Sequence, residues 1–157
     1  MSIVFEHGID LPQTPGAVFA CLDDFKRVPL WLKRCEGVAK QGQGPNKVGD
    51  KLRYAYAEGG KHRIMDGVIA AYEPDRQLSY RYYDKMMQVF VDFQMEAQGP
   101  GTRLTHRIEI VPNSFLAKLM SPLFRMKVPK QTVVAMENLR QLLATEEAVS
   151  AGDIGEY

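Results

Sequence analysis

Apolar residues in segment 113–147 recur at steps of three and four residues, the spacing that places side chains on one face of a helix. Asn113 or Ser114 can cap the start of this helix by accepting a hydrogen bond from a free amide of the first turn. A helix of this length needs a partner against which its apolar face is buried. The pattern therefore predicts a long C-terminal helix around which the rest of the chain is organised.

Two prolines, Pro122 and Pro129, lie inside this helical pattern. Each lacks the backbone donor of an ordinary helical residue and crowds the preceding turn, at a cost of roughly 3 kcal/mol in a helix interior. We therefore expect a kink or a break between residues 121 and 130 rather than one straight helix.

The chain begins with an alternating apolar and polar segment, residues 3–11, which is typical of a half-buried strand. Thr14 and Pro15 then suit the cap and the first position of a short helix. A second short helix is expected at residues 29–33, and it carries the only tryptophan, Trp31. Two short helices therefore follow the first strand.

Between residues 36 and 111 the period changes to two, with glycine and proline turns between the runs. The predicted strands are 36–41, 49–58, 61–72, 77–83, 86–98 and 102–111. Together with the first strand they make seven, and their short connections favour an antiparallel sheet. The predicted fold class is α+β.

The inward face of the strand at 61–72 is ambiguous. Its better apolar face consists of Ile64, Val68, Ala70 and Tyr72. That register also turns His62 and Asp66 inward, and a bulge at Gly67 would resolve the conflict. Because a buried Asp66 would need a hydrogen-bonding partner, a place at a rim or a bulge is the preferred interpretation.

The order of elements, and not a catalytic signature, relates this chain to a known family. The segments LPQTPGAVFACLDDFKRVPLWL, GVIAAYEPDRQLSYRY and ENLRQLLATEE resemble the paired helices, a central hairpin and the helix end of the START/Bet v 1-like (SRPBCC) superfamily, in its polyketide cyclase/dehydrase-like branch. The resemblance covers residues 2–147. It implies a helix-grip fold, in which a curled seven-stranded sheet holds the long helix and leaves a cavity for an apolar ligand.

Inward tyrosines bring rings and hydroxyls that suit a planar, oxygen-bearing ligand, although the same side chains could pack an ordinary core. Flexible methionines would let such a cavity accept varied shapes. The residues predicted to line the ligand site are Trp31, Tyr54, Tyr56, Tyr80, Tyr82, Val91, Phe93, Met95, His106, Ile108, Phe115, Leu119, Met120 and Leu123.

Two histidines, His7 and His106, fall on the inward faces of the first and last strands. The family resemblance implies that these strands pair, which would bring the two side chains together. A neutral imidazole in an apolar cavity could act as an acid or a base near neutral pH, but a lone inward histidine is more often a core residue or a ligand anchor. His106 is therefore a candidate catalytic residue, while a non-catalytic role is preferred.

Composition and charge narrow the function classes. A chain of 157 residues forms one domain by default, which we place at residues 1–147, followed by a frayed tail at 148–157. The 20 basic and 19 acidic residues give a net charge of +1, and therefore no global field that would attract nucleic acid. The cysteines and histidines match no metal-ligand spacing, so we expect neither a metal nor a cofactor.

The N-terminus has no secretory signal pattern, and no run of about 18 apolar residues occurs. This predicts a cytoplasmic protein with reduced thiols and no stable membrane insertion. A cluster of cations in the C-terminal segment is interpreted as a solvated face, with contact to anionic lipid headgroups as the alternative. A homodimer is left open. The cluster consists of Lys118, Arg125, Lys127 and Lys130.

Three function classes follow. The first is a non-catalytic module that holds a small hydrophobic molecule, which could be aromatic, polyketide-like or lipid-like, between sheet and helix. The second is an enzyme of the cyclase or dehydratase type, in which His106 or a tyrosine moves a proton. The third is a protein that resembles the quinone-binding or ribosome-associated members of the superfamily. Fold alone does not decide among them.

Overall fold

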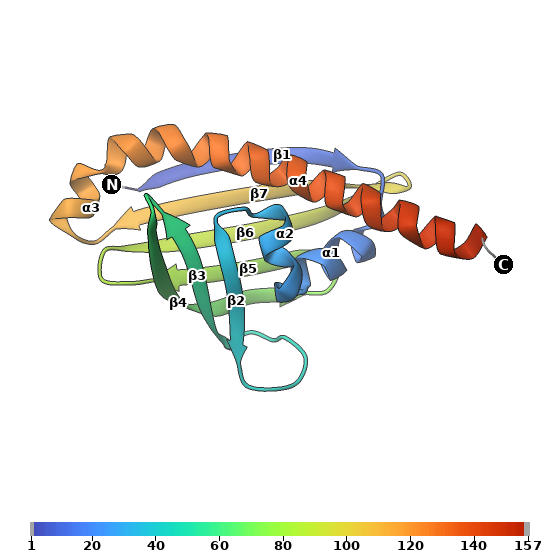
Figure 1. Cartoon of the computed structure of the whole chain (residues 1–157), viewed down its shortest axis with the longest axis horizontal. Helices are drawn as coiled ribbons and strands as arrows, with labels where there is room; N and C mark the ends of the chain where they lie inside the picture. Colours follow the sequence, from blue (N-terminus) through green and yellow to red (C-terminus); the bar gives the residue numbers. More distant parts are fainter. Residues whose placement is uncertain (1, 156–157) are drawn as a thin grey trace.

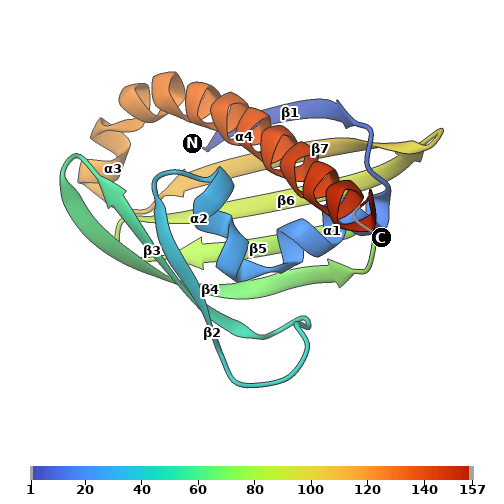
Figure 2. The same ribbon diagram turned by 45° about the vertical axis from the view of Figure 1, so that its right-hand side comes forward.

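The computed structural model describes residues 2–155 and confirms the predicted helix-grip architecture. A single antiparallel sheet of seven strands, in the order β1-β7-β6-β5-β4-β3-β2, curls around the C-terminal helix α4 (Figures 1 and 2). The strands are β1 Ile3–Leu11, β2 Cys35–Gln41, β3 Lys51–Glu58, β4 Lys61–Glu73, β5 Gln77–Tyr83, β6 Met87–Gln98 and β7 Gly101–Pro112. The helices are α1 Pro15–Asp23, the 3-10 turn η1 Phe25–Arg27, α2 Val28–Trp31, α3 Phe115–Leu119 and α4 Ser121–Gly155.

Side-chain caps set where the first helices begin. Thr14 Oγ1 accepts a hydrogen bond from the Ala17 amide at 3.2 Å, and Pro15 follows in the first turn, as predicted. Asp24 caps η1 in the same way by accepting from the Lys26 amide. The chain therefore turns sharply after β1 and places α1 and α2 over the concave face of the sheet.

The C-terminal helical segment is divided at Met120, one residue before the predicted interval. Ser114 is the residue that caps α3, and it accepts from the Ala117 amide at 3.1 Å. Pro122 lies in the first turn of α4, where its missing donor costs little, and α4 continues through Pro129. The helix extends to Gly155, so most of the tail expected to be frayed is helical, while residues 156–157 lie outside the described residues.

Strand β4 faces opposite to the predicted register. Tyr54 of β3 pairs with Met65, and because directly opposite residues share a face, Met65 and Ile69 point inward and are buried. The correction turns Ile64, His62 and Asp66 outward, where all three are exposed.

The bulge lies at residue 70 rather than at Gly67, since the β4–β5 pairing shifts between Ile69 and Ala71. The extra residue brings Tyr72 back to the inner side, where its ring contacts Phe19 edge-on. The role of Gly67 is instead one of space, because a Cβ there would meet the Tyr82 ring at 2.5 Å.

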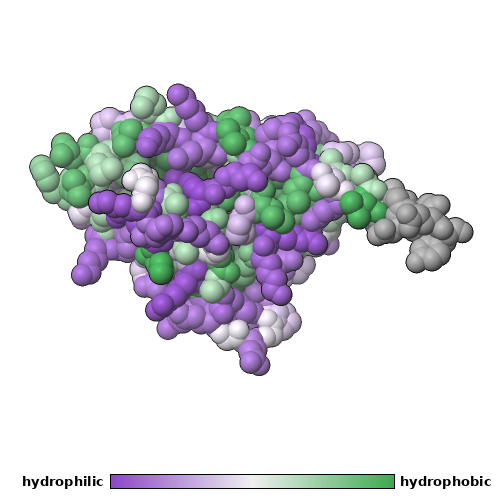
Figure 3. All heavy atoms as spheres, in the orientation of Figure 1, coloured by the Kyte–Doolittle hydropathy of each residue, from purple (hydrophilic) through white to green (hydrophobic). Residues whose placement is uncertain are grey.

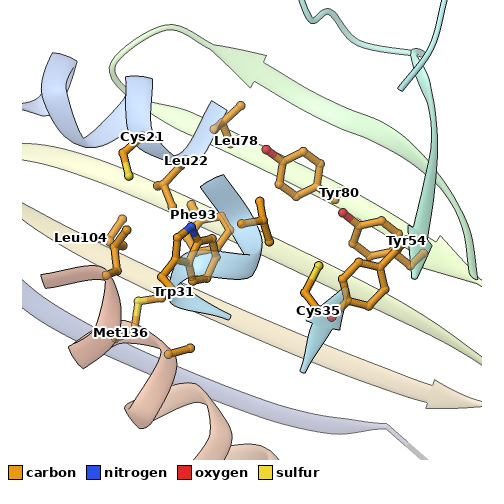
Figure 4. Packing of buried hydrophobic residues seen from close by; sticks show 14 of the residues in the cluster. Cys21, Leu22, Trp31, Cys35, Tyr54, Leu78, Tyr80, Phe93, Leu104 and Met136 are labelled. Atoms are coloured by element: carbon orange, nitrogen blue, oxygen red, sulfur yellow. The ribbon is translucent and has the colours of Figure 1, made fainter. Parts of the chain in front are cut away.

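The core lies between the concave face and the helices. Leu78 and Leu104 of the sheet, Leu22 of α1 and Met136 of α4 are almost completely buried and belong to one hydrophobic cluster (Figure 4). Both cysteines are buried free thiols, and burial raises the pKa of Cys35 to about 11. Among the described residues, no helix combines the length and apolarity needed to cross a membrane.

A close approach between the start of β7 and the end of β1 provides a stability test. A Cβ at Gly101 would overlap the backbone carbonyl of Leu11, which is held in the β1–β7 pairing. We expect Gly101→Ala to lower the free energy of unfolding by about 1–3 kcal/mol in chemical denaturation. The control Gly37→Ala has open space around the new methyl group and should change it by less than about 0.5 kcal/mol. Equal effects of the two substitutions would contradict the proposed clash.

Candidate ligand-binding cavity

A cavity of about 120 Å³ lies between the concave face of the sheet, the α1–α2 segment and α4. Its wall is mostly apolar and draws on elements that are far apart in the sequence. The sheet supplies Val38, Met65, Met87, Val89, Val91, Ile108 and Ile110, and the helical segments supply Leu22, Phe25, Val28, Leu32, Phe124, Val128 and Ala135.

Four tyrosines form one side of the cavity. Tyr54 and Tyr56 of β3 stack with ring centroids 5.3 Å apart, and Tyr82 of β5 lies 5.0 Å from Tyr54 and 6.1 Å from Tyr80. Burial raises the pKa of Tyr54 to about 12 and moves the pKa of Tyr80 and Tyr82 upward as well. These phenols therefore stay protonated at neutral pH and can each donate one hydrogen bond.

A second aromatic group lies further along the sheet, where Trp31 of α2 meets Phe93 (Figure 4). The Trp31 ring contacts Phe93 edge-on at 6.0 Å, and Phe93 stacks on His106 at 4.5 Å with 10° between the ring planes. The stacking follows from the register, because Phe93 and His106 are directly paired across β6 and β7.

His106 is buried and neutral. Its pKa is lowered to about 4, first because burial penalises the imidazolium and second because His7 lies nearby, while Asp92 acts weakly in the opposite direction. His7 and His106 are directly opposite in the β1–β7 pairing, which confirms that the two histidines are neighbours. At neutral pH the His106 ring carries one donor and one acceptor nitrogen.

Three cavity residues carry polar atoms that are buried without a hydrogen-bond partner among residues 2–155. They are Trp31 Nε1, the Tyr80 hydroxyl and His106 Nδ1. An unpaired buried polar group costs roughly 1–3 kcal/mol, so such groups are uncommon in a packed core. The three residues come from α2, β5 and β7, and all of them line the cavity.

Polar side chains mark the edge of the cavity. Arg34, Glu58, Lys127 and Gln131 line it and are partly or fully exposed. Arg34 Nη1 donates to Gln131 Oε1 at 2.8 Å, and its guanidinium lies 5.5 Å from the centre of the Tyr56 ring. The rim therefore contains a hydrogen bond that joins the chain before β2 to α4.

The structure brings most of the residues predicted for the site to this cavity. Those on its wall are Trp31, Tyr54, Tyr56, Tyr80, Tyr82, Val91, Phe93, His106 and Ile108. Five others lie elsewhere: Met95 is buried outside the cavity, Met120 is half-buried at the helix break, and Phe115, Leu119 and Leu123 are exposed. For the four residues of the helical segment the division at Met120 is the physical reason, because α3 and the first turn of α4 do not continue the buried face of the later turns. Met95 lies near the end of β6, where it pairs with Leu104 beyond the cavity.

Sequence reasoning missed the helical side of the wall. Phe124, Val128, Thr132 and Ala135 all line the cavity from α4, and Leu22 and Phe25 line it from the first helical segment. The spacing of four and three residues from 124 to 135 carries this information. The apolar residues at 116, 119, 123 and 126 have a similar spacing, so the pattern alone did not show which face of the helix lines the cavity.

Comparisons with known proteins agree with this arrangement. The family model for polyketide cyclase / dehydrase and lipid transport matches residues 2–144. The Zhui aromatase/cyclase from Streptomyces sp. R1128 has a similar structure, with a TM-score of 0.76, 13% identity and coverage of 92% of this chain and 94% of that one. A START superfamily protein from Mycobacterium smegmatis also has a similar structure, with a TM-score of 0.76, 11% identity and coverage of 90% of this chain and 97% of that one.

A comparison with curated protein sequences finds no match. The structural likenesses, at these identities, concern the fold alone. The family match spans nearly the whole described domain, including every strand and the cavity-lining part of α4. This chain therefore belongs to the polyketide cyclase / dehydrase and lipid transport family.

Proposed function

We propose that this protein binds a small apolar molecule, aromatic or similarly flat, that carries one or two oxygen atoms. The observation that carries the proposal is that three residues lining a mostly apolar cavity each hold a buried polar atom with no hydrogen-bond partner. The ligand's apolar surface would supply affinity at about 25 cal/mol per Å² removed from water. Hydrogen bonds to the three atoms would set its orientation.

The donor and acceptor types narrow the ligand further. The Trp31 indole can only donate, so it requires an acceptor such as a carbonyl or phenolic oxygen. The Tyr80 hydroxyl can donate or accept, and the role of His106 Nδ1 depends on which nitrogen carries the proton. A quinone, a phenol or an aromatic ketone satisfies this set, whereas a plain hydrocarbon leaves it unpaired.

Size sets a second limit. A cavity of about 120 Å³ is close to the volume of about 150 Å³ at which a closed apolar cavity in another protein takes up benzene. A single ring with short substituents fits without rearrangement. A polyketide or a lipid chain would require the cavity to widen, and the Arg34–Gln131 hydrogen bond at the rim is the contact that such widening would break.

An enzyme of the cyclase or dehydratase type is the second candidate, and the observation in its favour is an imidazole inside the cavity. A general base works best when its pKa lies near the working pH. With a pKa of about 4, His106 holds a proton too weakly at neutral pH to be well matched to that task. We therefore favour binding, with His106 as an anchor.

Native mass spectrometry of protein gently purified from its own source tests the proposal directly. The expected result is a stoichiometric bound molecule that is released on denaturation and contains an aromatic or conjugated oxygen-bearing group. A stable protein partner in place of any small molecule would support the interaction function and contradict the proposal.

Removing the Tyr80 hydroxyl gives a test that needs no ligand. Since this hydroxyl is buried without a partner, Tyr80→Phe should raise the free energy of unfolding by about 1–2 kcal/mol. The matched control is Tyr72→Phe, because the Tyr72 hydroxyl donates to Asp23 Oδ2 at 2.8 Å. In that variant the free energy of unfolding should fall by about 1 kcal/mol or more. Destabilisation by both substitutions in chemical denaturation would show that Tyr80 is already satisfied.

A matched pair of probes tests the hydrogen-bonding role of the wall. Toluene and p-cresol share their shape, and p-cresol adds one hydroxyl. One hydrogen bond of about 0.5–1.5 kcal/mol predicts roughly 2- to 10-fold tighter binding of p-cresol. Trp31 is the only tryptophan, so its single indole N–H resonance in ¹H–¹⁵N NMR reports binding directly.

The control for location is Ala135→Leu. This substitution places a larger side chain of α4 in the cavity, so it should weaken the binding of both probes. Unchanged binding in that variant, or equal affinity for toluene and p-cresol in the wild type, would contradict the assigned site.

The lowered pKa of His106 predicts a pH-dependent stability. Between pH 6.5 and about 4 the unfolded chain binds the proton and the folded chain does not, so the free energy of unfolding falls as the pH falls through this range. The loss should approach about 3 kcal/mol. Chemical denaturation of the His106→Gln variant should lack this part of the slope. An unchanged slope would mean that His106 is not the group responsible.

A further inference from the structure

Five apolar side chains of α3 and the first turns of α4 are exposed to solvent. Phe115 is 81% exposed, Leu119 66% and Met126 57%. We call this set the α3–α4 corner; its members are Phe115, Leu116, Leu119, Leu123 and Met126. Figure 3 shows apolar residues gathered at the end of the molecule where α3 lies. A cluster of this kind, as opposed to scattered single residues, marks an interaction surface.

The same segment is strongly basic. Residues 110–136 contain four cations and neither aspartate nor glutamate, although the whole chain has a net charge of only +1. All four are exposed, and within residues 2–155 none of them forms an ion pair. They are Lys118, Arg125, Lys127 and Lys130. The corner therefore combines exposed apolar side chains with unneutralised positive charge.

The combination of apolar groups and cations selects among occupants. A second copy related by a two-fold axis would bring the same cations face to face, which opposes association. An anionic bilayer satisfies both features, because apolar side chains enter the boundary between headgroups and acyl chains while lysine and arginine meet phosphate and carboxylate groups. We propose that the α3–α4 corner docks on the surface of a membrane that contains anionic phospholipids.

The corner adjoins the cavity. On the first turns of α4, Leu123 and Met126 point to solvent, whereas Phe124, Lys127 and Val128 line the cavity. Docking would thus place one end of the cavity wall beside the bilayer. Exchange of a ligand with the membrane rests on the proposed function, whereas docking does not. If the protein binds no small molecule, docking can still be tested, and if it does not dock, ligand binding can still be tested.

Flotation with vesicles tests the docking. Wild-type protein should bind vesicles of phosphatidylcholine containing about one third phosphatidylserine, bind pure phosphatidylcholine far less, and dissociate as salt is raised. The double variant Lys118→Gln/Arg125→Gln should bind roughly 30-fold more weakly, since each cation near an anionic surface contributes about fivefold. The variant Phe115→Ser/Leu119→Ser should bind the same vesicles about tenfold or more weakly.

Matched controls remove the same groups away from the corner. Lys26→Gln/Lys51→Gln removes two exposed cations, and Val48→Ser/Val149→Ser removes two exposed apolar side chains. Both should bind vesicles as the wild type does. All substituted residues are exposed, so the variants should keep the wild-type circular dichroism spectrum and unfolding midpoint.

Two results would overturn the proposal. One is that the wild type does not bind anionic vesicles, or that the wild type and the variants with substitutions in α3 and α4 bind them equally well. The other is a wild-type dimer in sedimentation that Phe115→Ser/Leu119→Ser converts to monomer, which would mean that a second copy covers the corner.

Discussion

Met136 and Leu139 of α4 are completely buried against the concave face of the sheet, and this contact holds the remaining parts in place. The curled sheet of seven strands has β1 and β2 at its two edges, and these strands do not pair with each other, so its inner face stays open. The helix covers one part of that face, and the α1–α2 segment covers another. The cavity lies where neither element fills the remaining space, so it is a direct result of how the layers meet.

The cavity wall combines two demands that oppose each other. Closely packed aromatic rings stabilise the fold, as in the contact between Phe93 and His106. Three polar atoms without partners destabilise it by an amount that an evolved core normally avoids. Such a cost is common where binding or chemistry takes place, because a ligand can satisfy groups that the protein leaves unpaired. The wall is therefore better organised for occupancy than for maximal stability.

Much of the architecture could be predicted from local patterns. Alternation located every strand to within about two residues, and the cap at Thr14 located the first helix, because both signals depend only on neighbours in the chain. The orientation of β4 could not be predicted in this way. Ile64 and Met65 are both apolar, and only the pairing of Met65 with Tyr54 decides which of them is buried.

The limits for the site have the same origin. Residues on the strands, such as Tyr80 and His106, were assigned to the cavity because strand alternation fixes a face. The helical contribution depended on where the segment 113–147 divides. A break at Met120 separates the exposed Leu119 from the cavity-lining Phe124, and no local signal distinguished that position from the prolines that follow. The Arg34–Gln131 hydrogen bond joins residues that only the tertiary fold brings together.

The position of β1 has a consequence for how the chain acquires its structure during synthesis. β1 ends at Leu11, yet its partner along the sheet is β7, which begins at Gly101. β1 is made before the other strands of this sheet and must therefore wait, unpaired, until nearly the whole sheet has been made. The hairpins from β2 to β7 need only short loops to form, whereas β1 joins by closing the longest loop in the sheet, which is the step with the greatest entropic cost. A nascent chain that does not yet include β7 thus exposes an apolar strand that has no partner to pair with.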